Sequence, residues 1–192
     1  MFIAFEGPDK AGKTTSATNL AHDGVAIYNA TKEMHAAMQE QMLLEPELPV
    51  TYDRIDWLTH MVYRLAMPTR EWNDKRVRTV FAMPDTHLVF KLHLEAGKVS
   101  DELYEVGDLN PVNAAYAQTA MWLAMLNGTQ DFQLFRSVSV MTVQHDQETG
   151  AYSQRLAELA APVFPWLDGN ERTVDSDESL LEMLRGIDQQ IG

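Results

Sequence analysis

One segment near the start of the chain limits the possible fold more than any other. It fits the pattern G-x-x-x-x-G-K-[ST] and consists of Gly7, Pro8, Asp9, Lys10, Ala11, Gly12, Lys13 and Thr14, with Thr15 following. An apolar stretch over residues 2–5 precedes it, and a predicted helix over 14–21 follows it. Glycines let backbone N–H groups turn inward around phosphate oxygens, and the helix directs its positive end at the same anion. The segment therefore predicts a phosphate-binding loop between a buried strand and a helix.

Two side chains of this loop have predicted roles in phosphoryl transfer. We expect Lys13 to reach the β- and γ-phosphates of a nucleotide and Thr14 to offer its hydroxyl to Mg²⁺. A GTPase would carry an Asn-Lys-x-Asp segment late in the chain to read its base, and this sequence has none. The sequence therefore does not predict a GTPase.

The remainder of the chain alternates apolar strands with amphipathic helices. Strands are predicted over residues 2–5, 25–28, 50–52, 86–92 and 138–143, and helices over 14–21, 31–44, 57–65, 72–82, 110–126, 152–160 and after Ser176. The dipeptide at 173–174 is too short to assign. This alternation predicts one α/β domain over residues 1–192, with a five-stranded parallel sheet flanked by helices. The polar segment over residues 93–108 is predicted to be a short lid.

Asp53 and Arg54 directly follow the third predicted strand. The carboxyl ends of parallel strands meet at one edge of a sheet, so this pair should lie beside the phosphate loop. The Asp53 carboxylate can hold the metal or its waters, and the Arg54 guanidinium can bind a phosphate through two parallel hydrogen bonds. An ordinary surface ion pair at a helix start is the alternative interpretation.

Composition limits the partners of this chain. There is no cysteine, so disulfides, thiolate metal sites and cysteine nucleophiles are excluded. Neither a membrane span nor a signal peptide is predicted, and we expect a cytoplasmic protein. Acidic residues exceed basic ones by 28 to 15, a net charge of −13 that phosphate backbones repel. We expect small nucleotides as substrates and no nucleic-acid partner, unless Lys75, Arg76 and Arg78 form a local contact.

The opening stretch FIAFEGPDKAGKTT resembles that of the thymidylate kinases. YDR at residues 52–54 resembles the Asp-Arg motif of that family, MPDTHLVFKLHL resembles its Pro-Asp followed by a strand, and TVDSDESLLEML is similar to its last strand, turn and helix. The resemblance implies transfer of a phosphoryl group from ATP to a deoxynucleoside monophosphate, dTMP first among them, with Mg²⁺ and usually in a homodimer. It also implies that Asp9 approaches the sugar of the acceptor and that Arg54 holds its phosphate.

The chain departs from the family pattern after its second predicted strand. Thymidylate kinases have an Arg and a Pro there that grip the acceptor, whereas this chain has no arginine before Arg54. Trp57, Arg64 and Arg70 are the candidate replacements for acceptor binding. Trp57 also belongs to an apolar stripe of its helix, which favours a place in the core.

Lys10 is the candidate for the catalytic cation. The transition state of phosphoryl transfer spreads negative charge over the oxygens in flight, and a nearby cation lowers the barrier. Thymidylate kinases supply an Arg from the loop or the lid, but residues 93–108 contain no arginine and only Lys98 as a fully charged cation. We therefore predict that Lys10 acts with Lys13, Asp53 and Arg54. A solvated surface lysine is the alternative.

Other functions stay open from the sequence alone. A deoxynucleoside kinase would need an acidic general base after the second strand, and residues 29–32 offer none. A kinase acting on a modified base in DNA is opposed by the net charge. A nucleotide-binding regulator without transfer activity is opposed by the presence of Lys13, Thr14, Asp53 and Arg54.

Overall fold

A seven-stranded sheet forms the centre of the computed structural model, which describes residues 1–44, 48–72, 75, 79–96, 99, 105–127, 133–145, 152–158, 172–173 and 176–191. Its strands lie in the order β2-β3-β1-β4-β5-β6-β7. The strands are β1 (Phe2–Glu6), β2 (Ile27–Ala30), β3 (Val50–Ile55), β4 (Met83–His93), β5 (Phe135–His145), β6 (Tyr152–Glu158) and β7 (Arg172–Thr173). The first five pair in parallel, which confirms the predicted five-stranded parallel sheet.

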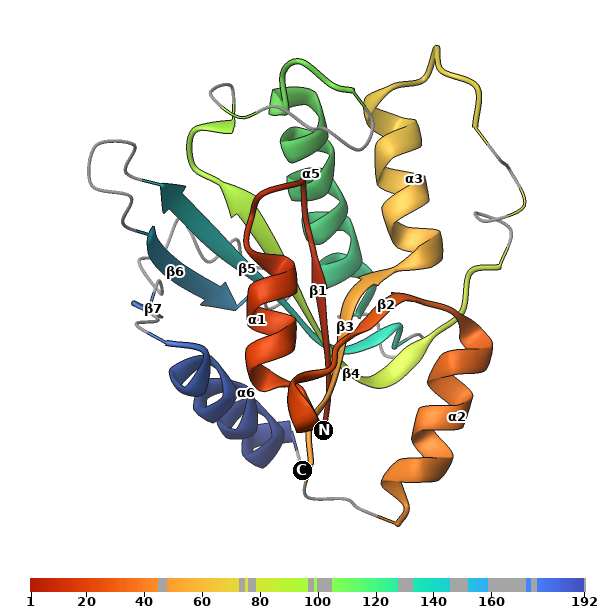
Figure 1. Cartoon of the computed structure of the whole chain (residues 1–192), viewed down its shortest axis with the longest axis vertical. Coiled ribbons are helices and arrows are strands. Elements are labelled where there is room, and N and C mark those ends of the chain that lie inside the picture. The colour runs from red at the N-terminus through yellow and green to blue at the C-terminus, as the bar shows by residue number, and fades with distance from the viewer. Residues whose placement is uncertain are drawn as a thin grey trace.

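Helices cover both faces of this sheet (Figure 1). They are α1 (Lys13–Leu20), α2 (Lys32–Met42), α3 (Asp56–Ala66), α5 (Asn110–Asn127) and α6 (Asp177–Ile191), with a 3₁₀ turn, η1, at His22–Gly24. The Thr31 hydroxyl accepts from the N–H of Met34 at 3.4 Å and Ser176 Oγ from the N–H of Ser179 at 3.2 Å, so both residues cap the helices that they precede. The cap at Ser176 is the predicted one.

Alternate residues of β1 divide the core into two layers. Ile3 and Phe5 pack with Leu20 of α1 and Leu184 of α6, whereas Phe2 and Ala4 belong to the cluster that contains buried residues of α3 and α5. Side chains of a strand point alternately to opposite faces, so β1 is buried on both sides. Its carboxyl end, at the middle of the sheet, carries the glycine loop.

Two predicted helices differ in the structure. Residues 152–158 form β6, which pairs antiparallel with β5 in a register that matches Tyr152 to His145, so the predicted helix over 152–160 is wrong. Without β6, β5 would present a row of unpaired backbone groups, and pairing with that edge outweighs a weak helical preference. Lys75 is helical, but residues 79–82 lie outside any helix, so the helix predicted over 72–82 ends earlier. Residues 73–74 and 76–78, including Arg76 and Arg78, lie outside the described residues.

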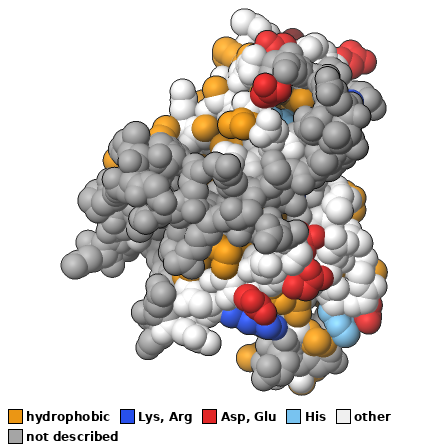
Figure 2. Space-filling model, turned by 90° about the vertical axis from the view of Figure 1, so that its left-hand side faces the viewer, with side chains coloured by type: hydrophobic (Ala, Val, Ile, Leu, Met, Phe, Trp, Pro, Cys, Tyr) orange, Lys and Arg blue, Asp and Glu red, His pale blue; other side chains and the backbone are white. Residues whose placement is uncertain are grey.

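None of the described helices has both the length and the apolar character that a membrane span requires. Figure 2 shows one face of the molecule, on which acidic side chains lie at both ends with few basic ones among them. The coloured residues of this face therefore offer no broad basic surface.

Candidate active site

The glycine loop has a backbone that side chains would obstruct. Gly7 has φ 145°, and an added Cβ there would lie 2.1 Å from the carbonyl oxygen of Lys91 on β4. Gly12 has φ 73° and directly precedes α1, which has no side-chain cap at its start. The first N–H groups of α1 therefore have no intrahelical partner and point toward the loop. An uncapped helix start behind a glycine loop can bind phosphate oxygens.

Lys13 is buried in this loop, with 4% of its surface exposed. Its ammonium donates a hydrogen bond to the carbonyl oxygen of Pro8 at 2.5 Å, so the side chain folds back along the loop. Burial, together with the positive charge of Arg54, lowers the pKa of Lys13 to about 7. Phosphate groups at the loop would supply the negative charge that favours its protonated form.

Thr14 and Asp53 meet at the start of α1, as the sequence predicts for a metal site. The Thr14 hydroxyl donates to Asp53 Oδ2 at 2.6 Å, and Asp53 Oδ1 is buried without a hydrogen-bond partner. Mg²⁺ is usually held by one or two protein oxygens together with substrate phosphates. A hydroxyl beside a carboxylate with an unsatisfied buried oxygen fits that requirement.

Arg54 extends from the end of β3 to the loop. Its Nη1 donates to the carbonyl oxygen of Gly7 at 3.1 Å and to the Tyr116 hydroxyl at 3.3 Å, and its Nη2 contacts Asp9 Oδ1 at 2.5 Å. The residue has φ 78°, an uncommon value for a side-chain-bearing residue that the surrounding contacts must hold in place. Asp9 and Arg54, both predicted for the acceptor, are therefore neighbours.

Glu6, the last residue of β1, is fully buried behind Arg54. Its Oε1 accepts from the Ile55 N–H at 2.5 Å and from the Thr59 hydroxyl at 3.0 Å, and its Oε2 accepts from the Tyr116 hydroxyl at 3.1 Å. Burial raises the pKa of this carboxyl, while the charge of Arg54 opposes the rise. Glu6 therefore joins the ends of β1 and β3 to α3 and α5.

Sequence reasoning assigned no role to Glu6, Tyr116, Lys91 or His93. Lys91 donates to the Gly12 carbonyl oxygen at 3.1 Å and to Ser16 Oγ at 2.8 Å, and His93 Nε2 lies 2.7 Å from the carbonyl oxygen of Asp9. The position of Lys91 within the apolar stretch LVFKL could have indicated a specific role, because a buried charge needs hydrogen-bond partners. Tyr116 looked like an ordinary core residue of its helix.

The other predicted acceptor residues lie on or after α3. Trp57 is 2% exposed and its ring stacks with Phe135 at 6.5 Å, so it packs in the core, and its indole N–H is buried without a hydrogen-bond partner. Arg64 is exposed in the last turn of α3, about 12 Å along the axis from the helix start. Arg70 is exposed, with its guanidinium 5.1 Å from the centre of the Trp72 ring. The roles of Trp57, Arg64 and Arg70 in acceptor binding stay predictions.

Other predicted residues are placed as follows. Lys10 is exposed and has φ 59°, a backbone conformation that favours glycine. Pro8 and Ala11 are buried, and Thr15 is exposed at the start of α1. His93, predicted in the lid, is the last residue of β4. Lys98 lies outside the described residues, as does much of the segment over 93–108.

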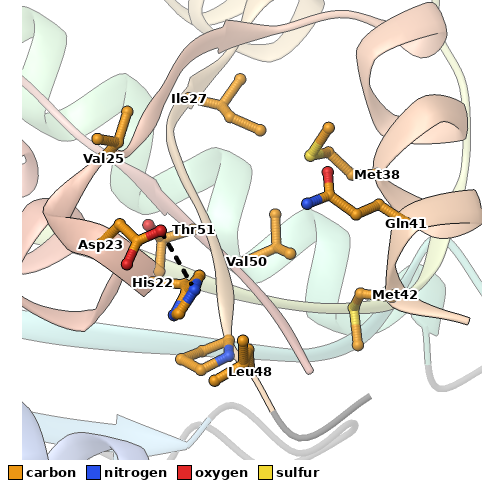
Figure 3. Close-up of a pocket in the computed structure, with 11 residues that line it drawn as sticks. His22, Asp23, Val25, Ile27, Met38, Gln41, Met42, Leu48, Val50 and Thr51 are labelled. Atoms are coloured by element: carbon orange, nitrogen blue, oxygen red, sulfur yellow. Dashed lines mark ion pairs between the residues drawn. The ribbon is translucent and has the colours of Figure 1, made fainter. Parts of the chain in front are cut away.

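A pocket of about 320 Å³ lies at the amino ends of β2 and β3, whereas the glycine loop follows the carboxyl end of β1. Figure 3 shows side chains of η1, β2, α2 and β3 around it, among them Ile27, Met38 and Val50. Because Ile27 and Val50 begin their strands and the glycine loop follows the end of β1, this mainly apolar pocket is separate from the loop. His22 and Asp23 form an ion pair at 3.2 Å on its border.

Comparison with known proteins gives a similarity at the level of structure but none at the level of sequence. No family model matches the chain, and neither does a curated protein. Among solved structures, the chain is similar to the thymidylate kinase from Ehrlichia chaffeensis, with 17% sequence identity and a TM-score of 0.38. The match covers 78% of this chain and 89% of that chain. At these values the similarity leaves substrate and reaction open.

Proposed function

We propose that this chain is a nucleoside monophosphate kinase, which transfers the γ-phosphoryl group of ATP to a deoxynucleoside monophosphate. The contact of Arg54 with Asp9, a residue of the loop that also contains Lys13 and Thr14, carries this proposal. It brings a bidentate phosphate-binding group to the donor loop, as transfer between two phosphates requires. The resemblance of the motifs to thymidylate kinases makes dTMP the first acceptor to test.

The donor side of the proposal depends on the loop itself. The N–H groups at the start of α1 and the Lys13 ammonium would hold the ATP phosphates, and Lys10 would approach the phosphoryl group in flight. Thr14 and Asp53 would hold Mg²⁺, which supplies positive charge to the phosphate oxygens when bound. Because most of the reaction is positioning and charge stabilisation, these residues suffice without a covalent intermediate.

On the acceptor side, Arg54 would exchange part of its present hydrogen bonding for the acceptor phosphate. Nη2 is held by Asp9 and Nη1 by two uncharged oxygens, so an acceptor phosphate would form its two bonds to the guanidinium in place of the Gly7 contact, while the Tyr116 hydroxyl continues to orient the group. Tyr116 and Glu6 lie behind the guanidinium and limit its movement. The arrangement favours an acceptor that carries a phosphate over an uncharged nucleoside.

The test is a panel of nucleosides, nucleoside monophosphates and DNA, each supplied with ATP and Mg²⁺ and scored for ADP release and for the phosphorylated product. We expect product with a deoxynucleoside monophosphate and none with Lys13→Ala, because Lys13 is the loop cation nearest the transferred group. Lys32→Ala, at an exposed position that starts α2, is the matched control and should keep the parental rate. Unchanged turnover of Lys13→Ala at saturating ATP would contradict the assignment of the phosphate loop.

Arg54→Lys separates the acceptor role from the donor role. An ammonium cannot replace a guanidinium that forms two parallel bonds, so we expect kcat/KM for the monophosphate to fall about ten- to a hundredfold. Arg185→Lys, at an exposed position of α6, is the control. Parental efficiency of Arg54→Lys on every monophosphate would remove Arg54 from the acceptor site.

A further inference from the structure

Lys91 of β4 lies against both ends of the phosphate loop, at Gly7 and at Gly12. Its carbonyl oxygen lies 2.1 Å from the position of a Cβ on Gly7, and its ammonium donates to the Gly12 carbonyl oxygen at 3.1 Å and to Ser16 Oγ at 2.8 Å. Only 2% of the residue is exposed. A side chain at Gly7 would therefore displace the backbone of Lys91, and a movement of the Gly12 carbonyl oxygen would break its bond to the Lys91 ammonium.

The charge of this lysine is in an unfavourable place while the loop is empty of anions. Its ammonium lies at the start of α1, where the helix dipole is positive. Burial lowers its pKa to about 8, although the carboxylate of Asp177 acts in the opposite direction. In the part of the chain that the structure describes, no carboxylate forms an ion pair with Lys91. A buried charge without a close counter-ion lowers the stability of the folded state.

An anion bound to the loop would make the positive charge of Lys91 favourable. Phosphate oxygens bound by the first N–H groups of α1 would lie on the far side of the Gly12 backbone from the ammonium. A buried region of low polarity transmits that attraction more strongly than water does. The same charge that destabilises the ligand-free protein would then stabilise the complex.

We propose that Lys91 positions the phosphate loop at Gly12 and supplies positive charge to the donor phosphates. The affinity of the loop for a nucleotide then depends on the number of phosphates that the nucleotide carries. This inference rests on the proposed binding of nucleotide phosphates by the loop. It adds a second buried cation to Lys13. Lys91 acts through the loop backbone, so it is not a catalytic residue.

Two variants test this inference. Lys91→Met keeps the length of the side chain and removes its charge, and Lys91→Gln removes the charge but keeps an N–H donor for Gly12. Lys32→Met is the exposed control. For each protein, calorimetry gives the Kd of ATP, ADP and AMP with Mg²⁺, and thermal unfolding gives Tm with and without ATP.

We expect both Lys91 variants to bind ATP about tenfold more weakly than the parent and ADP less so, with AMP nearly unchanged. The ligand-free Tm should stay level or rise, and the increase in Tm on adding ATP should shrink. A purely structural lysine would lower the ligand-free Tm and leave the order of affinities unchanged. Equal Kd values for parent and variants, or an equal loss for all three nucleotides, would overturn the inference. A parent that binds neither ATP nor inorganic tripolyphosphate would overturn the proposed function as well.

Discussion

Tyr116→Phe tests whether the buried contacts behind Arg54 support the site. The substitution removes one oxygen and keeps a ring that packs 6.2 Å from Tyr63 and 6.1 Å from Phe90. Two hydrogen bonds are lost, one from Arg54 Nη1 at 3.3 Å and one to Glu6 Oε2 at 3.1 Å. The effect therefore measures the hydroxyl alone.

The magnitude follows from what the two partners retain. Arg54 Nη1 keeps the Gly7 carbonyl oxygen, and Glu6 keeps the N–H of Ile55 and the hydroxyl of Thr59. A hydrogen bond to a charged group contributes about 1.5–3 kcal/mol, and both bonds here are long. Since neither charged group is left without a partner, we expect unfolding free energy to fall by about 2–3 kcal/mol. For a chain of this size, that corresponds to a decrease in Tm of about 4–12 °C.

Thermal unfolding and kinetics with the monophosphate acceptor provide the assay. Tyr28→Phe, at a tyrosine that is 57% exposed, should leave Tm unchanged. In Tyr116→Phe, KM for the acceptor should rise more than kcat falls, because Arg54 loses a contact that limits its orientation. If both Tm and KM of Tyr116→Phe equal those of the parent, the hydroxyl contributes nothing and the reasoning is refuted.

Two further predictions concern the cation at the loop and the acid limit of stability. Lys10→Ala should lower kcat about a hundredfold with little change in the Kd of ATP, because the interaction of Lys10 with the transferred phosphoryl group strengthens only in the transition state. Steady-state kinetics measures kcat, and calorimetry measures the Kd of ATP. If Lys10→Ala keeps the parental kcat, another residue supplies the catalytic cation. Burial opposes ionisation of Asp85, yet hydrogen bonds from His35 and Gln39 lower its pKa to about 2 from 3.8. The stability that the Asp85 carboxylate contributes is therefore present above pH 3.8 and is lost as pH falls toward 2. In urea unfolding, the free energy of unfolding of Asp85→Asn should decrease less over that pH range than that of the parent. An equal decrease in both proteins would contradict the lowered pKa of Asp85.

The sequence alone determined the loop and its setting. Glycines at positions 7 and 12, followed by Lys13 and Thr14, predict both the loop backbone and a phosphate-binding role, because the residues that carry this pattern lie close together in the chain. The alternation of strands with helices likewise predicted the five parallel strands and the approach of Asp53 and Arg54 to the loop. These features depend on local pattern and on the common edge at which parallel strands end.

Only the tertiary structure decided which distant residues complete the site. Lys91, Tyr116 and Glu6 reach the loop or Arg54 through pairing of β1 with β4 and packing of α5 on the sheet, and no spacing along the chain encodes those contacts. Trp57 fits the pattern of a ligand contact as well as that of a core residue, and packing against Phe135 placed it in the core. The same holds for β6, since a segment with weak helical preference becomes a strand when a sheet edge offers it a full row of hydrogen bonds.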